Sequence, residues 1–245
     1  MKVIVIIPAA GLGTRMAPFP SGKKGKGVPS KQFTELGGTP ILLHTLRKFA
    51  AMPEVSAICV ALRVNEIEGF HKRLEKEAKE VLQKKIHLVE GGEHRQHSVA
   101  NALAAISAAE DDVILVHDAV RPFVTPEIIG GVIQAAQKYG AAIAGFPATD
   151  TVKMVDRTAE GAVITATVPR EKVVMAQTPQ GFRYGVIKKA FDEAAADGFL
   201  GTDEAALVER SGHPVAVVMG SPRNIKITTP ADMELAEFYL RQAEQ

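Results

Sequence analysis

Hydrophobic residues along this chain gather in short continuous runs that alternate with stretches of helical periodicity. Short apolar runs bounded by polar residues predict strands that are buried on both faces. Such runs predict strands at Val3–Ile7, Ala57–Leu62, Ile86–Val89, Val113–Val116, Ala141–Phe146 and Val215–Val218. Amphipathic spacing predicts helices at Ile41–Ala50, Glu66–Leu82, Ser98–Ala108, Pro126–Tyr139 and Tyr184–Ala196, and a closing helix from Pro230 to about Arg241.

Regular alternation of buried strands and helices predicts an α/β fold with a doubly wound, mostly parallel sheet. Ligands of such sheets bind at the carboxyl ends of the strands, so polar residues there are the first candidates for a site. The chain has 245 residues, enough for one large domain or two small ones. Because no repeat or linker divides it, we expect a single domain over residues 1–245.

The alternation stops between Thr149 and Met175. There Val152–Val155 and Val163–Thr167 flank a turn-like segment, which predicts a β-hairpin arm within about 149–175. An isolated two-stranded hairpin is only marginally stable in water. The arm therefore packs either on its own domain or on a second subunit.

Small residues follow the first predicted strand at Ala10, Gly11 and Gly13. They let backbone amides approach a phosphate closely, and Arg15 and Lys31 add positive charge nearby. This pattern favours a nucleoside triphosphate site, although a tight strand-to-helix turn would use the same glycines.

The sequence argues against two other kinds of nucleotide site, the dinucleotide-binding fingerprint and the P-loop. Met16 stands where a dinucleotide-binding fingerprint needs its third glycine, and Arg63 follows the second strand where an acidic residue is expected. The P-loop is excluded because no Gly-Lys-Ser/Thr triplet is present.

Composition narrows the possible partners. The net charge is +1, which argues against a general nucleic-acid surface. The single Cys59 lies in an apolar strand, where a buried structural thiol is expected. The apolar N-terminal run is too short to cross a membrane. We therefore expect a cytoplasmic protein with no nucleic-acid and no membrane partner.

Further polar clusters follow other predicted strands. Gly92 and Ser98 open a helix, either as an ordinary capped start with Ser98 as the cap or as contacts to a base or ribose. Asp118 suits a divalent cation or ribose hydroxyls, since Mg²⁺ takes one or two carboxylates beside substrate phosphates. Arg121 forms either a salt bridge with Asp118 or a phosphate contact.

The remaining clusters lie in the last third of the chain. One is 177–182, which includes Thr178. Another is Thr202, followed by Asp203 and Glu204, which we expect to cap a helix. Lys226 alternates with Ile225 and Ile227, so it points to the face opposite these apolar side chains.

These clusters, in this order and across almost the whole chain, resemble the 2-C-methyl-D-erythritol 4-phosphate cytidylyltransferases of the non-mevalonate isoprenoid pathway. The resemblance implies a nucleotidyltransferase domain that forms a homodimer through the arm. It also implies a Mg²⁺-dependent reaction of CTP with 2-C-methyl-D-erythritol 4-phosphate, which gives 4-diphosphocytidyl-2-C-methyl-D-erythritol and pyrophosphate.

The resemblance also implies roles for single residues. The catalytic residues are Arg15, Lys31 and Lys226; the nucleotide-binding residues are Ala10, Gly11, Gly13, Gly92, Ser98 and Asp118, with Asp118 also as metal ligand; the substrate-binding residues are Arg121, Thr151, Arg170, Thr178 and Thr202. Since Thr151 and Arg170 lie on the arm, they would serve the partner subunit's site.

Two departures from the family pattern stand out. The Gly/Lys-rich segment 17–30 is longer than expected; its lysines suit a flap over phosphates or a solvated mobile loop, and we expect the mobile loop. No acidic residue stands just before Asn224 to orient Lys226.

The expected chemistry is an in-line attack of the acceptor's phosphate oxygen on the α-phosphorus of CTP. That oxygen is already ionised at neutral pH, so catalysis needs positioned positive charge rather than a general base. The alternatives are a cytidylyltransferase for another alditol phosphate, such as ribitol 5-phosphate, and a non-catalytic nucleotide-binding regulator with the same fold. A nicotinamide-dependent dehydrogenase is disfavoured by the missing fingerprint.

Overall fold

A computed structural model of the chain describes residues 1–11 and 30–243. Gly13, Arg15 and nearly all of the predicted mobile loop at 17–30 lie outside the described residues, so the expectations for them stay predictions.

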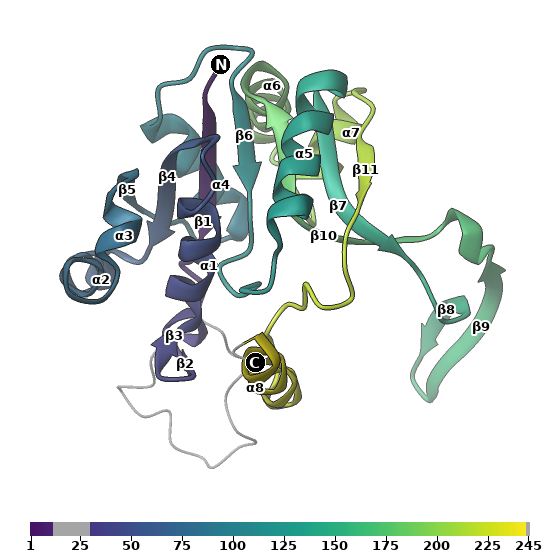
Figure 1. The fold of residues 1–245 in the computed structure, drawn as a ribbon. Helices are drawn as coiled ribbons and strands as arrows, with labels where there is room; N and C mark the ends of the chain where they lie inside the picture. Colours follow the sequence, from purple (N-terminus) through teal and green to yellow (C-terminus); the bar gives the residue numbers. More distant parts are fainter. Residues whose placement is uncertain (12–29, 244–245) are drawn as a thin grey trace.

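A seven-stranded sheet forms the centre of the fold, in the order β11-β7-β10-β6-β1-β4-β5 (Figure 1). Its strands are β1 (Val3–Pro8), β4 (Val55–Leu62), β5 (Lys85–Glu90), β6 (Val113–Val116), β7 (Ala141–Pro147), β10 (Val174–Arg183) and β11 (Ala216–Met219). All neighbours pair in parallel except β10, which runs antiparallel to β6 and β7. The predicted mostly parallel sheet is confirmed, with β10 as an additional strand.

Eight α-helices are found in the described part of the chain. They are α1 (Ile41–Ala50), α2 (Val64–Glu77), α3 (Lys79–Leu82), α4 (Arg95–Ala105), α5 (Pro126–Tyr139), α6 (Tyr184–Ala196), α7 (Glu204–Arg210) and α8 (Pro230–Ala243). A short 3-10 helix, η2 (Lys31–Phe33), precedes a small hairpin of β2 (Glu35–Leu36) and β3 (Thr39–Pro40).

The alternation within β1 shows why its strand is a continuous apolar run. Val3, Val5 and Ile7 pack in the same core as α1, α2 and α5. Ile4 and Ile6 pack on the other face with α4, α6 and α7. With a helical layer on both faces, each side chain of the strand is buried and none needs to be polar.

Two helix predictions differ from the structure. The predicted helix Glu66–Leu82 is two helices, because Ala78 leaves helical geometry at φ −147° and ψ 50°. That break lets Val81 turn into the core beside Leu74. The predicted Ser98–Ala108 helix begins earlier, at Arg95, with His94 as its N-cap, so Ser98 is not the cap.

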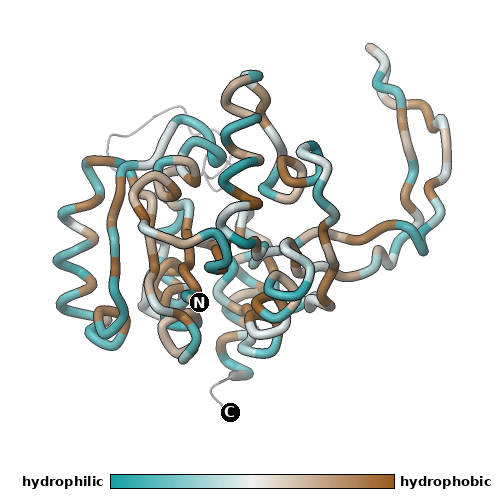
Figure 2. Tube along the Cα trace, turned by 90° about the horizontal axis from the view of Figure 1, so that it is seen from above, coloured by the Kyte–Doolittle hydropathy of each residue, from teal (hydrophilic) through white to brown (hydrophobic). Residues whose placement is uncertain are grey.

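The predicted arm is confirmed as a separate hairpin of β8 (Val152–Thr158) and β9 (Gly161–Val168). Figures 1 and 2 show it standing away from the sheet, and Figure 2 shows hydrophobic stretches on its strands. Its large apolar side chains are exposed by 44–59%: Met154, Val155, Val163 and Ile164. In the described chain this apolar surface is left to solvent.

None of the helices in residues 1–11 and 30–243 has both the length and the apolar character needed to cross a bilayer.

Candidate active site

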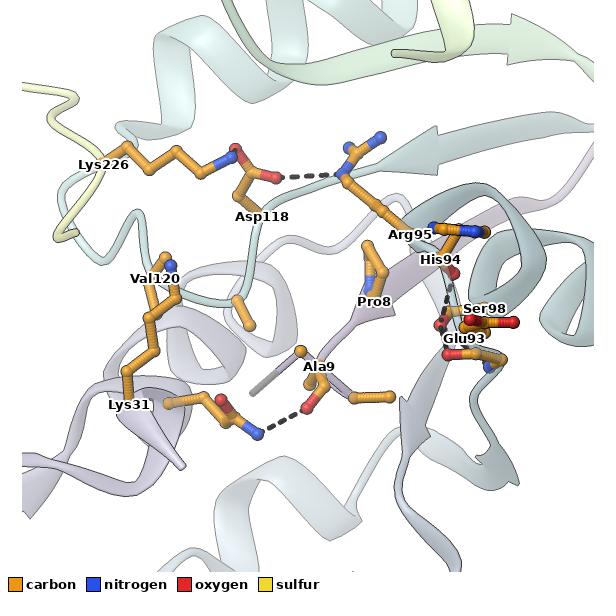
Figure 3. Close-up of a pocket in the computed structure, with 15 residues that line it drawn as sticks. Pro8, Ala9, Lys31, Glu93, His94, Arg95, Ser98, Asp118, Val120 and Lys226 are labelled. Carbon is orange, nitrogen blue, oxygen red and sulfur yellow. Dashed lines mark hydrogen bonds and ion pairs between the residues drawn. The ribbon is translucent and has the colours of Figure 1, made fainter. Parts of the chain in front are cut away.

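A cleft lies at the carboxyl ends of β1 and β6, where ligands of parallel sheets bind (Figure 3). Its walls come from four parts of the chain: the segment after β1, the start of η2, the turn and helix start after β5, and the segment after β6, joined by Lys226. Of the predicted site residues, the cleft is lined by Ala10, Gly11, Lys31, Gly92, Ser98, Asp118 and Lys226.

The turn before α4 is closely packed against the segment after β1. A Cβ at Gly91 would lie 2.3 Å from the Ala10 Cβ, and a Cβ at Gly92 would lie 2.3 Å from the His97 Cβ. Both positions therefore require glycine. The Ser98 hydroxyl accepts the Gly92 N–H at 3.0 Å, so Ser98 shapes this turn from within the helix.

The backbone after β1 is held by neighbouring side chains. The amide of Ala9 donates to the Ala61 carbonyl at 2.8 Å, and the Arg63 Nε donates to the Ala10 carbonyl at 3.0 Å. Gln32, which is buried, donates to the Ala9 carbonyl. These bonds fix the wall of the cleft that the segment after β1 forms. Lys31, at the start of η2, also lines the cleft (Figure 3).

Asp118, directly after β6, binds three cationic side chains. Its Oδ1 accepts from the Arg95 Nε at 3.3 Å. Its Oδ2 accepts from the Arg121 Nε at 3.1 Å and lies 2.9 Å from the Lys226 Nζ. Arg121 thus forms the salt bridge expected as the simpler of its two roles.

Burial and charge act in opposite directions on Asp118. Its side chain is only 8% exposed, and this burial alone would raise its pKa. The cations Arg95, Lys226 and Arg121 outweigh burial and hold the pKa of Asp118 well below its ordinary value. The carboxylate is therefore ionised and fixes the positions of the cations around it.

Lys226 is oriented as its alternation with isoleucines predicts. Ile227 is fully buried in a core with Val120 and Ala236, and its amide donates to the Val120 carbonyl at 2.9 Å. The Lys226 side chain points the other way, toward Asp118 (Figure 3). Asp118 supplies the acidic partner that the sequence near Asn224 lacks.

A second pocket adjoins the first and shares Arg95, Asp118 and Lys226 with it. The predicted substrate-binding residues that line it are Arg121, Thr178 and Thr202. Two adjacent pockets with shared cations could hold two anionic groups side by side.

The Thr178 hydroxyl is engaged within the protein. It accepts the Asp118 N–H at 3.0 Å and bonds to His117 Nδ1 at 3.1 Å, while the other ring nitrogen of His117 bonds to the Arg121 carbonyl at 3.1 Å. Burial lowers the pKa of His117 to about 4, so the ring is neutral and accepts at Nδ1. Thr178 thus holds Asp118 in place.

The β10 strand brings Thr178 to this position through an irregularity. Its register with β7 shifts between Ala176 and Gln180. Such bulges re-aim side chains and are common beside active sites. Gln177, within the bulge, donates to the Ser221 carbonyl at 2.8 Å and so ties the Lys226 segment to the sheet.

The two arm residues of the predicted site do not line either pocket. Thr151 is exposed just before β8, and the Arg170 Nη1 donates to the Thr149 carbonyl at 2.8 Å near the base of the arm. In a single chain the structure therefore does not bring Thr151 and Arg170 together with Lys226.

Asp118 does not fit the role of a metal ligand. Both carboxylate oxygens already bind cations, which a divalent ion would have to displace. Over residues 1–11 and 30–243, no group of three histidine, cysteine or acidic side chains is arranged to hold a metal. We therefore assign Asp118 to the orientation of Lys226 and Arg121.

Sequence reasoning missed one buried contact of the site. Arg95 Nη1 donates to both carboxylate oxygens of Glu204, at 2.6 and 2.7 Å. Asp203, as expected, caps α7 by accepting the Ala206 N–H at 3.0 Å, but Glu204 is 1% exposed and binds Arg95 instead of capping. Separated by 109 residues, Arg95 and Glu204 carry no local signal of their contact.

Known proteins resemble this chain over its whole length. The family model for 2-C-methyl-D-erythritol 4-phosphate cytidylyltransferase matches residues 3–242. Proteins with that name from Acidobacterium capsulatum and Solibacter usitatus are 58% and 50% identical over 242 residues, which cover 99% of this chain and 98% and 97% of theirs.

Solved structures agree. The crystal structure of the Francisella tularensis 2-C-methyl-D-erythritol 4-phosphate cytidylyltransferase aligns with a TM-score of 0.79 at 35% identity, over 97% of this chain and 99% of that one. The Thermus thermophilus structure aligns with a TM-score of 0.75 at 34% identity, over 98% and 100%. The chain therefore belongs to the 2-C-methyl-D-erythritol 4-phosphate cytidylyltransferase family of nucleotidyltransferases.

Proposed function

We propose that this chain transfers the cytidylyl group of CTP to 2-C-methyl-D-erythritol 4-phosphate and releases pyrophosphate, as an enzyme of the non-mevalonate isoprenoid pathway. One observation carries the mechanism: two adjacent pockets share Arg95, Asp118 and Lys226, with the Lys226 ammonium 2.9 Å from the Asp118 carboxylate. We assign the first pocket to CTP and the second to the acceptor.

The first pocket suits a nucleotide. Gly92 before α4 and Ser98 within it line this pocket, where a flat base or ribose can pack, and Lys31 lies on the opposite side of the cleft. Lys31 and Lys226 then lie on the side where the triphosphate would extend, with Arg15 expected nearby. The predicted contacts of Ala10, Gly11, Gly13 and Ser98 belong to this pocket.

In the transfer, an ionised oxygen of the acceptor phosphate attacks the α-phosphorus of CTP. A new P–O bond forms as the bond from the α-phosphorus to the bridging oxygen breaks, and pyrophosphate leaves with the electron pair. Because both reactants are anions, the main barrier is their repulsion and the charge that develops on the phosphoryl oxygens. Fixed cations reduce that barrier without reorganising during the reaction. We assign this role to Lys226, Lys31 and Arg15.

Mg²⁺ stays a prediction from the family resemblance. Magnesium commonly binds substrate phosphates and water with few protein ligands, so CTP itself can supply most of its oxygens. No step above depends on a metal bound to Asp118.

We further propose a homodimer formed through the arm. The exposed apolar side chains of β8 and β9 and the marginal stability of an isolated hairpin favour a covering surface from a second copy. Thr151 and Arg170, which lie outside their own chain's pockets, would then complete the partner subunit's acceptor pocket.

Subunit complementation tests this arrangement. Arg170→Ala and Lys226→Ala place the two defects in different chains of a mixed dimer, so one site regains both wild-type residues. The assay uses an acceptor concentration well below the KM of Arg170→Ala, where each variant alone is nearly inactive. Random mixing should then restore about a quarter of wild-type activity, since about half the dimers are mixed and each has one intact site. Two inactive variants that gain no activity on mixing would contradict a shared site.

The activity itself is tested by pyrophosphate release. CTP, UTP, ATP and GTP are each assayed with 2-C-methyl-D-erythritol 4-phosphate, and CTP is also assayed with ribitol 5-phosphate. We expect turnover with CTP and the methylerythritol phosphate. Preference for ribitol 5-phosphate would reassign the acceptor, and no release with any pair would favour the non-catalytic regulator.

The cytoplasmic location and the absence of nucleic-acid and membrane partners also stay proposals.

A further inference from the structure

A buried ion pair joins the two pockets. The Arg95 guanidinium donates through Nη1 to both oxygens of Glu204, whose side chain is 1% exposed, and through Nε to Asp118 at 3.3 Å. Arg95 comes from the start of α4, Glu204 from the start of α7, and Asp118 from the segment that follows β6. One planar guanidinium therefore links three segments that meet at the site.

Glu204 is not needed merely to hold α7 in place. Gln180 already fixes the start of that helix: its Nε2 donates to Asp203 Oδ2 at 2.8 Å and its Oε1 accepts the Ala205 N–H at 3.0 Å. The loop before it is held by Gln96, whose side chain bonds to the Phe199 carbonyl and the Gly201 amide, both at 2.9 Å. These neutral amides already anchor α7, so the position of the helix does not depend on the charge of Glu204.

Buried ion pairs contribute little net stability, because desolvation offsets their attraction. A charged pair at this place is better explained by its effect on the neighbouring carboxylate. Arg95 occupies one oxygen of Asp118, which leaves the other to Arg121 and Lys226. Glu204 binds the Nη1 end of the Arg95 guanidinium and neutralises part of its charge. The attraction of Arg95 for Asp118 is therefore weaker, and Asp118 stays beside Lys226.

We propose that Arg95 and Glu204 are positioning residues of the transfer reaction: the pair fixes the Asp118 carboxylate and thereby holds the Lys226 ammonium where the two pockets meet. This inference rests on the proposed function. It adds that the Arg95 side chain couples the two pockets. Arg95 belongs to the nucleotide pocket through the start of α4, and it reaches the acceptor pocket through the Thr202–Glu204 segment.

The net charge of Asp118 and the charged side chains around it shows in which direction Glu204→Gln would change the binding of anions. Burial raises the pKa of Glu204, while the Arg95 guanidinium at 2.6 Å favours its ionised form. With both carboxylates ionised, Arg95, Arg121 and Lys226 give three positive charges against two negative charges on Asp118 and Glu204, a balance of +1. Glu204→Gln keeps the shape but raises the balance to +2, so weaker binding of anions cannot come from the charge change itself. A rise in the acceptor KM together with a fall in kcat would then report misplacement.

The test compares steady-state kinetics of Glu204→Gln and Arg95→Lys with wild type. We expect kcat to fall about 10- to 100-fold in both, as misplacement of a reacting group does. The acceptor KM should rise about fivefold or more, and the KM for CTP should change less, because Lys31 and the glycine turn still hold the nucleotide. Arg95→Lys keeps the charge but lacks the planar fork that reaches both carboxylates.

Asp197→Asn is the matched control, since Asp197 forms an exposed ion pair with Arg210 on the same helix α7 and contacts neither pocket. Its kinetics should equal wild type. Unchanged kcat and acceptor KM in both test variants would overturn the inference. A fall in kcat that matches the unfolded fraction in a thermal melt, with both KM values unchanged, would also overturn it. Wild-type protein inactive with CTP and the methylerythritol phosphate would instead reject the proposed function.

Discussion

Replacement of Asp118 by asparagine removes the charge that holds the site's cations together. Asp118→Asn keeps the size of the side chain but leaves Arg95, Arg121 and Lys226 without their shared anion. Its effect on folding can be worked out from the surroundings of each cation.

The three cations do not lose equal amounts of electrostatic stabilisation in Asp118→Asn. Arg95 keeps Glu204, and the Lys226 side chain is 36% exposed, so its ammonium can turn toward water. The Arg121 side chain is 12% exposed, and among the described residues its charge keeps the Asn224 carbonyl, at 2.7 Å, but no second carboxylate. One buried cation is thus left unpaired, which places the loss near the lower end of the range for broken buried pairs, about 3 kcal/mol.

Urea unfolding measures this loss, and a thermal melt should show a matching shift of about 6–12 °C for a chain of this size. Asp192→Asn is the control: it removes a carboxylate from the exposed ion pair with Lys188, and the free energy of unfolding should change by less than about 1 kcal/mol. If Asp118→Asn costs no more than this control, the cations do not depend on Asp118 and the electrostatic reasoning for the site is wrong.

Other predictions concern catalysis and pH. Lys226→Ala should lower kcat by about 10²-fold or more, as loss of a fixed electrostatic donor does; the exposed Lys72→Ala should not, and near-normal turnover of Lys226→Ala at saturating substrate would remove Lys226 from the mechanism. Arg170→Ala should act mainly on the KM for the methylerythritol phosphate; unchanged KM and kcat would exclude Arg170 from the acceptor site. Burial lowers the pKa of His117 from 6.5 to about 4, so the unfolded chain binds more protons between these values. His117 therefore adds stability above its unfolded pKa that is lost as pH falls toward the folded one, up to about 3 kcal/mol, and His117→Gln should flatten urea midpoints measured across that range; an unchanged pH slope would contradict a buried neutral ring.

The sequence predicted most of the sheet because its strands are buried on both faces. Val3–Ile7 and Val113–Val116 have no exposed side and read as continuous apolar runs. The strand β10 was missed because it contains Pro179 and buried glutamines, which locally indicate a loop. Its position between β6 and β7 depends on pairing across the sheet, which no short window contains. The seven-residue α7 is too short to show helical periodicity.

For the site, too, the sequence predicted the features that have a local signal and missed the contacts between distant residues. Glycines at strand ends and the alternation around Lys226 are local signals, and the structure places Gly92 and Lys226 in one cleft. The partners of Lys226 are not local. Asp118 and Glu204 approach Arg95 only after three separate parts of the chain meet at the sheet edge, and the prediction of Asp118 as a metal ligand could not take account of the cations that bind it.

A crystal structure with CTP is the strongest test of electrostatic catalysis by Lys31 and Lys226, because it shows where the triphosphate lies relative to these cations. We expect cytidine against the Gly91–Gly92 turn and phosphoryl oxygens within hydrogen-bond distance of Lys31 and Lys226, with Asp118 still bound to Arg95. A triphosphate bound elsewhere, or a Lys226 ammonium that points away from it, would contradict the claim.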